Sequence, residues 1–223
     1  MRLSEKLLFL FTFSVVITGV VISHVNLDYY QAVFTREDYF LEWATVVALT
    51  LGMVTCLYRI KILSKFRELP FLLGLGFMSF MFLFGLGEEI SWGQRIFGWQ
   101  TNEWFCTYNT QCETNFHNLK FGELKINKLF FGLILGICIA FYFLILPFLF
   151  RKFEKVKSFV NSWAIPIPKY HHIAAYLLLF ILAQTIPGHK KGEILEFGGC
   201  WIFYIMILSP LNREHFSRKS FVR

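Results

Sequence analysis

Two adjacent acids, Glu88 and Glu89, end an apolar run in the stretch LFGLGEEISWGQRIFGW. A carboxylate at the carboxyl end of a helix meets the negative end of the helix dipole, so another group must compensate it. If the helix continues, Ser91, Trp92 and Arg95 follow Glu88 on one face. Arg95 then neutralises the acids. Alternatively the acids bind a cation or a proton, and Arg95 holds an anionic group of a substrate or lipid.

A second pair of chemically capable side chains follows in ETNFHNLK. Glu113 and His117 are four residues apart, a spacing that puts a carboxylate and an imidazole on one helix face. Such a pair suits a shared metal or acid–base chemistry. The neighbouring Asn115 and Asn118 leave a hydrogen-bonded loop as the alternative.

A third group lies near the end of the chain, in QTIPGHKKGEILEFGG. The Pro-Gly pair before His189 predicts a tight turn, with Glu193 and Glu196 in the first turns of the next helix. Glu42 holds the same first-turn position in the second apolar helix, where the helix dipole favours a carboxylate.

The composition predicts that membrane-spanning helices position these groups. Of the 223 residues, 56% are hydrophobic and only 17% are charged, and the mean hydropathy is +0.52. Long apolar runs of this kind predict membrane spans. The expected fold is a single all-α domain (1–223), a polytopic membrane helix bundle with six spans at about 7–25, 39–60, 70–87, 128–150, 171–187 and 193–209.

The charges predict how these spans are oriented. If the spans alternate, one side holds 15 of the 22 basic residues, and the positive-inside rule makes that side, with both termini, cytoplasmic. The same alternation puts 11 of the 15 acids on the outer face. The net charge of +7 therefore requires no nucleic-acid partner, and we expect none.

The 88–127 segment, which connects the third and fourth spans, is too long for a simple connection. Its scattered aromatic residues are typical of a chain lying at the headgroup level. Cys106 and Cys112 lie on the expected oxidising face and are predicted to form a disulfide. Cys56, Cys138 and Cys200 fall in apolar spans and are predicted to be inert packing residues.

Two sequence words resemble a known family. GEEISWGQRIFGW and NTQCETNFHNL resemble the signature of a family of uncharacterised bacterial integral membrane proteins, and REDYFLEW resembles that family's acidic start of the second span. The resemblance implies a bacterial inner-membrane, multi-pass protein. It implies no reaction, because no activity is established for that family.

Two functions follow as hypotheses. The first is an enzyme acting on a lipid or lipid-linked substrate at the outer leaflet, with a divalent metal such as zinc, iron or manganese. Its catalytic residues would be Glu88, Glu89, Glu113 and His117, its substrate-binding residues Arg95, Ser91, Gln94 and Trp92, and its metal ligands Glu88, Glu113, His117, His189 and Glu196. Ser91 as a nucleophile is a variant that needs a histidine supplied by the fold.

The second hypothesis is a non-catalytic subunit of a membrane complex, or a carrier coupled to cations or protons. Its acids would bind ions or protons, or would fasten the outer loops of the protein, and its partners would be membrane lipids and other membrane proteins. Convergence of the acids and histidines around one cleft would favour the enzyme. Acids paired individually with basic residues would favour the structural role.

Overall fold

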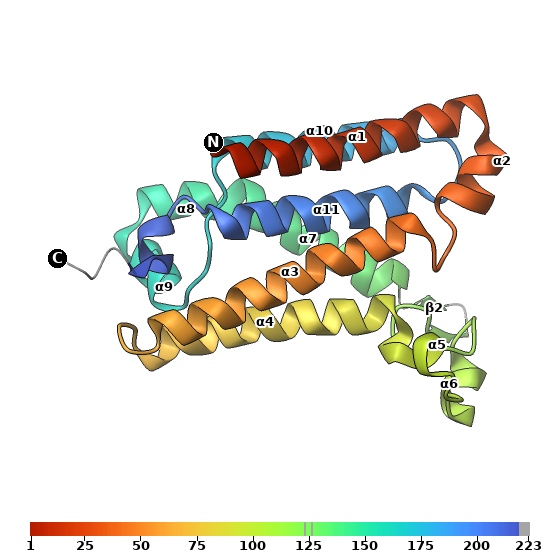
Figure 1. Ribbon diagram of the computed structural model, residues 1–223, viewed down its shortest axis with the longest axis horizontal. Helices are drawn as coiled ribbons and strands as arrows, with labels where there is room; N and C mark the ends of the chain where they lie inside the picture. Colours follow the sequence, from red (N-terminus) through yellow and green to blue (C-terminus); the bar gives the residue numbers. More distant parts are fainter. Residues whose placement is uncertain (123, 126, 219–223) are drawn as a thin grey trace.

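Helices make up most of the protein (Figure 1). The computed structural model describes residues 1–122, 124–125 and 127–218. The α-helices are α1 (Leu3–Val25), α2 (Leu27–Tyr29), α3 (Phe40–Leu63), α4 (Leu69–Glu89), α5 (Gln94–Phe97), α6 (Glu103–Tyr108), α7 (Leu135–Ala140), α8 (Leu146–Lys152), α9 (Glu154–Ser162), α10 (Tyr170–Thr185) and α11 (Lys191–Leu208). Short π and 3-10 helices adjoin them: η1 (Tyr30–Phe34), η2 (Ser91–Gly93), η3 (Asn127–Ile134), η4 (Phe141–Ile145) and η5 (Arg213–Phe216). Strand β1 (Lys120–Phe121) pairs antiparallel with β2 (Leu124–Lys125).

Among the described residues, four helices are long and apolar enough to cross a membrane, namely Leu3–Val25, Phe40–Leu63, Leu69–Glu89 and Gly132–Lys152. They correspond to the first four predicted spans and support the prediction of an all-α membrane protein. The fifth predicted span corresponds to α10, a shorter apolar helix of 16 residues. The sixth corresponds to α11, whose first two turns carry Lys191, Glu193 and Glu196. Six spans therefore stay a prediction.

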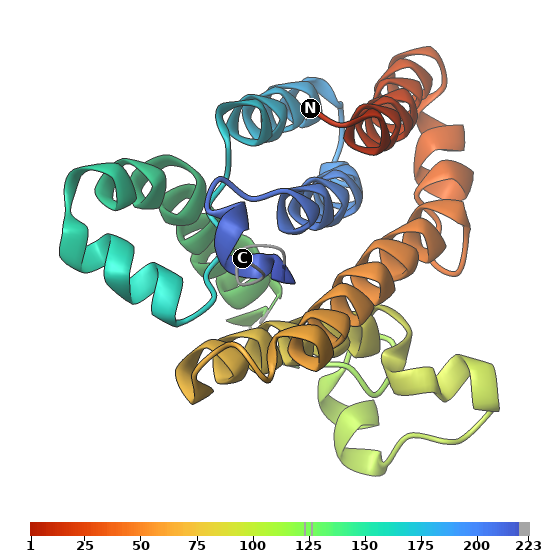
Figure 2. The same cartoon turned by 60° about the vertical axis from the view of Figure 1, so that its left-hand side comes forward.

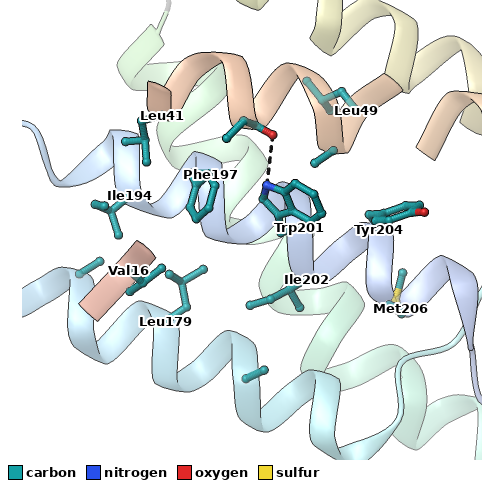
Figure 3. Close-up of a cluster of buried hydrophobic side chains, with 14 of the residues drawn as sticks. Val16, Leu41, Leu49, Leu179, Ile194, Phe197, Trp201, Ile202, Tyr204 and Met206 are labelled. Atoms are coloured by element: carbon teal, nitrogen blue, oxygen red, sulfur yellow. Dashed lines mark hydrogen bonds between the residues drawn. The ribbon is translucent and has the colours of Figure 1, made fainter. Parts of the chain in front are cut away.

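Helix α11 forms the centre of the bundle and packs against α1, α3 and α10. Its Phe197, Trp201 and Ile202 belong to the main apolar core (Figure 3). The Trp201 indole N–H donates to the carbonyl of Ala44 on α3 at 3.1 Å. A Cβ at Gly198 would lie 2.5 Å from a methyl group of Leu179, so this glycine lets α10 approach closely.

The sides of the bundle expose large apolar residues that a water-soluble protein would bury. Leu10 and Ile17 on α1, Val54 on α3, and Leu73 and Phe77 on α4 are all more than half exposed. Contiguous apolar surface of this kind is costly in water and favourable against lipid tails.

Both termini lie at one end of the bundle, and the segment containing α5 and α6 lies at the opposite end (Figure 1). In Figure 2, α11 (blue) lies between α1 (red) and the segment from α7 to α9 (green to cyan). Glu123, Lys219 and Arg223, which are among the charged residues counted above for the orientation of the spans, lie outside the described residues.

Candidate functional site

The carboxylate of Glu88 ends helix α4 and is held by a distant loop. Its side chain is almost buried, with the residue 4% exposed. Oε2 accepts the backbone N–H groups of Phe116 at 2.7 Å and His117 at 3.0 Å, and Oε1 accepts the Trp92 indole N–H at 3.0 Å. These charge-assisted hydrogen bonds offset the unfavourable helix dipole.

The chain turns sharply after Glu89, so α4 does not continue as the sequence analysis allowed. Ser91 and Trp92 have positive φ values of 47° and 54°, followed by Gly93 at 84°. Residues other than glycine rarely adopt this conformation, so surrounding contacts must stabilise it. A Cβ at Gly87 would lie 2.8 Å from the Trp92 ring. Only glycine therefore lets the indole fold back over the end of α4 and reach Glu88.

Ser91 belongs to a buried polar cluster with Glu113 and Asn115. Its hydroxyl donates to Glu113 Oε2 at 2.8 Å, and the Asn115 side-chain amide donates to Ser91 Oγ at 2.9 Å and to Glu113 Oε2 at 2.8 Å. Ser91 has no exposed surface. This environment makes Ser91 a hydrogen-bonding residue of the loop, since a nucleophile needs both access and an adjacent base.

Arg95 fastens three parts of the chain together. Its guanidinium contacts Asp38 at 2.9 Å, Glu42 at 2.8 Å and Glu113 at 3.5 Å, and also donates to the backbone carbonyl of Glu89 at 3.1 Å. Burial lowers the Arg95 pKa, but the surrounding carboxylates, Glu42 foremost, raise it by more. Because three carboxylates and a backbone carbonyl already contact the Arg95 guanidinium, a structural role is favoured over the predicted binding of an anionic group.

Three further carboxylates lie in the same region without such partners. Within the described residues, no hydrogen bond or ion pair engages the side-chain oxygens of Glu89, Glu193 or Glu196. The charges of Glu193 and Glu196 repel that of Glu89, while Arg95 attracts it. Like charges gathered at the end of apolar helices favour uptake of a proton or a cation.

His117 contacts the hydrogen-bonded acid Glu88 and is also influenced by the charge of Glu196. Its Nδ1 is 3.6 Å from Glu88 Oε2, and its side chain is 35% exposed. Burial lowers the His117 pKa, but the Glu88 carboxylate and the negative charges of Glu196 and Glu113 outweigh burial, so the pKa rises above its ordinary value. An imidazole oriented by a carboxylate and close to a second acid can take up and release a proton.

The predicted helical pairing of Glu113 with His117 is wrong. Residues 113–117 form turns and bends instead of a helix. Glu113 therefore pairs with Ser91 and Arg95, while His117 pairs with Glu88. The fold brings both residues to one region by a route that helical spacing does not describe.

The predicted disulfide is confirmed, because the sulfur atoms of Cys106 and Cys112 lie within bonding distance. Gln94 also holds this loop: its side-chain N–H donates to the carbonyl of Cys112 at 3.3 Å, and its side-chain oxygen accepts the N–H of Thr114 at 2.8 Å. Gln94 thus positions the loop that carries Glu113, instead of facing open space as a substrate ligand would.

The described residues contain no group of three or more His, Cys, Asp or Glu side chains arranged to hold a metal ion. His189 is exposed on the turn between α10 and α11. The Glu88 and Glu113 oxygens already accept N–H and O–H donors, so these residues, as arranged, do not fit the predicted metal. The divalent metal stays a prediction.

Comparisons with protein-family models, curated proteins and solved structures find no match to this chain. The signature resemblance therefore stays a prediction.

Two residues of the cluster were missed by sequence reasoning. Asn109 accepts the backbone N–H groups of Gln111 at 2.9 Å and Glu113 at 3.3 Å, and its amide donates to the Asn115 side chain at 2.8 Å. Asp38, at a positive φ of 63°, completes the carboxylates around Arg95. The only sequence signal for Asn109 is its place before Thr and a Cys, where an asparagine side chain often stabilises a turn.

Proposed function

We propose that the protein is a membrane enzyme that performs acid–base chemistry on a lipid or lipid-linked substrate, at the end of the bundle opposite the termini. The observation that carries this proposal is the setting of His117. Its imidazole is held by the buried Glu88 carboxylate and lies within electrostatic range of Glu196, an accessible acid without a hydrogen-bonding partner among the described residues.

In the proposed reaction, His117 acts as the general base. It removes a proton from water or from a substrate hydroxyl as the oxygen attacks the bond to be cleaved. Glu196 or Glu89, in its protonated form, donates a proton to the departing oxygen. Mutual repulsion of the neighbouring carboxylates favours a proton on one of them, which is the condition a general acid needs.

Aromatic residues around the site support a substrate that enters from the bilayer. Trp92, Phe97 and Trp99 are each at least 39% exposed, and such side chains gather at the membrane–water interface. A lipid-linked substrate at the headgroup level would therefore meet the same 88–127 segment that carries His117.

The sidedness of the site is also part of the proposal. If the spans alternate, most basic residues lie on the side of the termini. The positive-inside rule then favours a cytoplasmic position for that side, and hence a site at the outer leaflet. Together with the resemblance to bacterial membrane proteins, this favours the cytoplasmic membrane of a bacterium.

The ion pairs of Arg95 favour a second candidate function. A guanidinium shared by Asp38, Glu42 and Glu113 is a fastener of outer loops, as expected in a non-catalytic subunit. Glu89, Glu193 and Glu196, whose side chains have no hydrogen bond or ion pair within the described part of the chain, would then bind a proton or cation in a coupled carrier.

The test is conversion of defined lipids by the purified protein in nanodiscs. The probes are phosphatidylglycerol, phosphatidylethanolamine and a sugar linked to polyprenyl diphosphate, with products detected by mass spectrometry. His117→Gln should lower the turnover of any converted lipid by at least about 100-fold, the usual contribution of a general base. His24→Gln, which removes an exposed imidazole on α1, should leave it unchanged.

Turnover that survives His117→Gln would refute the acid–base mechanism. No conversion by the wild type, combined with a proton or cation flux across proteoliposomes that Glu196→Gln abolishes, would establish the carrier instead. Glu103→Gln, at an exposed acid of α6, controls for the loss of a charge.

A further inference from the structure

A buried arginine lies inside a candidate membrane span, at the end of the bundle opposite the Glu/His site. Arg59 belongs to α3 and is only 8% exposed. Its Nη2 donates to the backbone carbonyl of Ile207 at 2.7 Å, and its guanidinium carbon lies 4.9 Å from the centre of the Phe216 ring. Among the described residues, no carboxylate forms an ion pair with it.

The contact with Ile207 accounts for only one of the hydrogen-bond donors of Arg59 and leaves its charge without a counter-charge among the described residues. Ile207 lies in the last turn of α11, where backbone carbonyls lack helical partners and the dipole favours a cation. One N–H group of Arg59 satisfies one such carbonyl. The guanidinium has five N–H donors and a full positive charge, and an ionised group in an apolar span usually has a counter-charge.

A hollow in the protein surface lies directly beside this guanidinium. Its volume is about 370 Å³, and it is lined by Val54, Thr55, Tyr58, Arg59, Ile62, Leu208 and Phe216. The lining combines apolar side chains with two hydroxyl groups and one cation. Val54 and Tyr58 are 51% and 60% exposed, so the hollow adjoins the outward, lipid-facing side of α3.

The depth of the hollow fits the headgroup region of a bilayer. Arg59 is one turn before the end of α3 at Leu63, where the exposed Lys61 also lies. An arginine near a helix end usually extends toward water. Arg59 instead is buried, with its guanidinium against the last turn of α11 and beside the hollow, so interfacial anchoring does not account for its position.

We propose that this hollow binds the phosphate of a phospholipid from the leaflet on the side of the termini. Arg59 is the anion-binding residue, since a guanidinium can donate two parallel hydrogen bonds to a phosphodiester. Tyr58 offers a further hydroxyl donor. The acyl chains lie along the exposed apolar side of α3, which distinguishes a phospholipid from a soluble anion. This site is independent of the function proposed above.

Binding is measured on the full-length protein in detergent, by native mass spectrometry with increasing phosphatidylglycerol. Two probes separate the parts of the lipid: diacylglycerol with the same acyl chains, and inorganic phosphate. Phosphatidylglycerol should bind at least ten times more tightly than diacylglycerol, and inorganic phosphate should not displace it. Equal binding of diacylglycerol, or displacement by inorganic phosphate at similar concentration, would overturn the proposal.

Two pairs of variants locate the site. Arg59→Gln should weaken phosphatidylglycerol binding at least tenfold, whereas Lys61→Gln, which removes an exposed charge from the same helix, should change it less than twofold. Because Arg59→Gln also removes the contact with Ile207, a second variant leaves the arginine intact. Val54→Trp fills the hollow and should weaken binding to a similar extent.

Val47→Trp is the matched control for Val54→Trp. Val47 lies on the same helix, is similarly exposed at 47%, and is not part of the hollow. Equal phosphatidylglycerol affinity in Val54→Trp and Val47→Trp, with both proteins unfolding at the wild-type temperature, would show that the lipid binds elsewhere.

Discussion

Replacing Glu88 by Gln should release the outer loop without unfolding the bundle. The Glu88 carboxylate accepts the N–H groups of Phe116 and His117 on one oxygen and the Trp92 indole on the other. A glutamine amide has one oxygen, so its NH₂ group must face one of these donors. The variant loses at least one charge-assisted hydrogen bond and leaves a buried donor unsatisfied, a cost of about 3 kcal/mol.

Hydrogen–deuterium exchange measures this cost directly. A loss of about 3 kcal/mol in the opening free energy corresponds to exchange that is faster by on the order of 100-fold. The increase should be confined to peptides that contain Phe116 and His117, while the core peptides of α11 stay protected. Trp92 fluorescence should shift to longer wavelength as the indole loses its place against α4.

Glu89→Gln is the matched control one residue away. No hydrogen bond within the described residues engages the Glu89 side chain, and Arg95 contacts only its backbone carbonyl. The substitution also relieves repulsion from neighbouring acids, so exchange of the loop should change by less than threefold. If Glu88→Gln and Glu89→Gln accelerate exchange equally, or if neither does, the assignment of Glu88 as the anchor of this loop is wrong.

Three further predictions concern the same end of the bundle. Arg95→Lys keeps the charge but loses the planar fork, and should lower the unfolding free energy by about 1–2 kcal/mol in thermal denaturation; an unchanged transition would contradict its role as a fastener. Replacing Cys106 and Cys112 by Ser should raise proteolysis of the loop between them, with a loss of about 2 kcal/mol, and equal cleavage of the wild type would argue against a constraining bond. Because the folded-state pKa of His117 lies above its ordinary value of about 6.5, its contribution to stability is complete below about pH 6.5 and is lost as pH rises through the raised value; His117→Gln should abolish this part of the pH dependence.

The long apolar helices were the most predictable part of the fold. An exposed helix in a bilayer must be apolar over its whole length, so α1, α3 and α4 stand out in the sequence. Helix α11 was harder to predict as a central helix, because Glu193 and Glu196 make the first turns of this apolar segment polar. Its central position depends on packing, such as the close approach that Gly198 allows to α10, and a hydropathy pattern does not contain that information.

The sequence predicted many of the residues that belong to the site, but not which groups they contact. The position of Glu88 at the end of a helix indicated that it needs a compensating group. The candidates were Arg95, a proton or a cation. The actual partners include two backbone N–H groups, which every residue type except proline carries and which no motif can therefore identify. Likewise, the Glu113–His117 spacing suggested a helix face, whereas the loop divides the two residues between Arg95 and Glu88.

This division decides which substitutions can test a reaction. Glu88, Glu113 and Arg95 hold the loop in place, so loss of activity on replacing them would not separate chemistry from folding. Glu89 and Glu196 have no such hydrogen bonds within the described residues, and replacing either should leave the loop intact. An effect on turnover or ion coupling at these two positions, with unchanged exchange at Phe116 and His117, can therefore be assigned to the protons that the site carries.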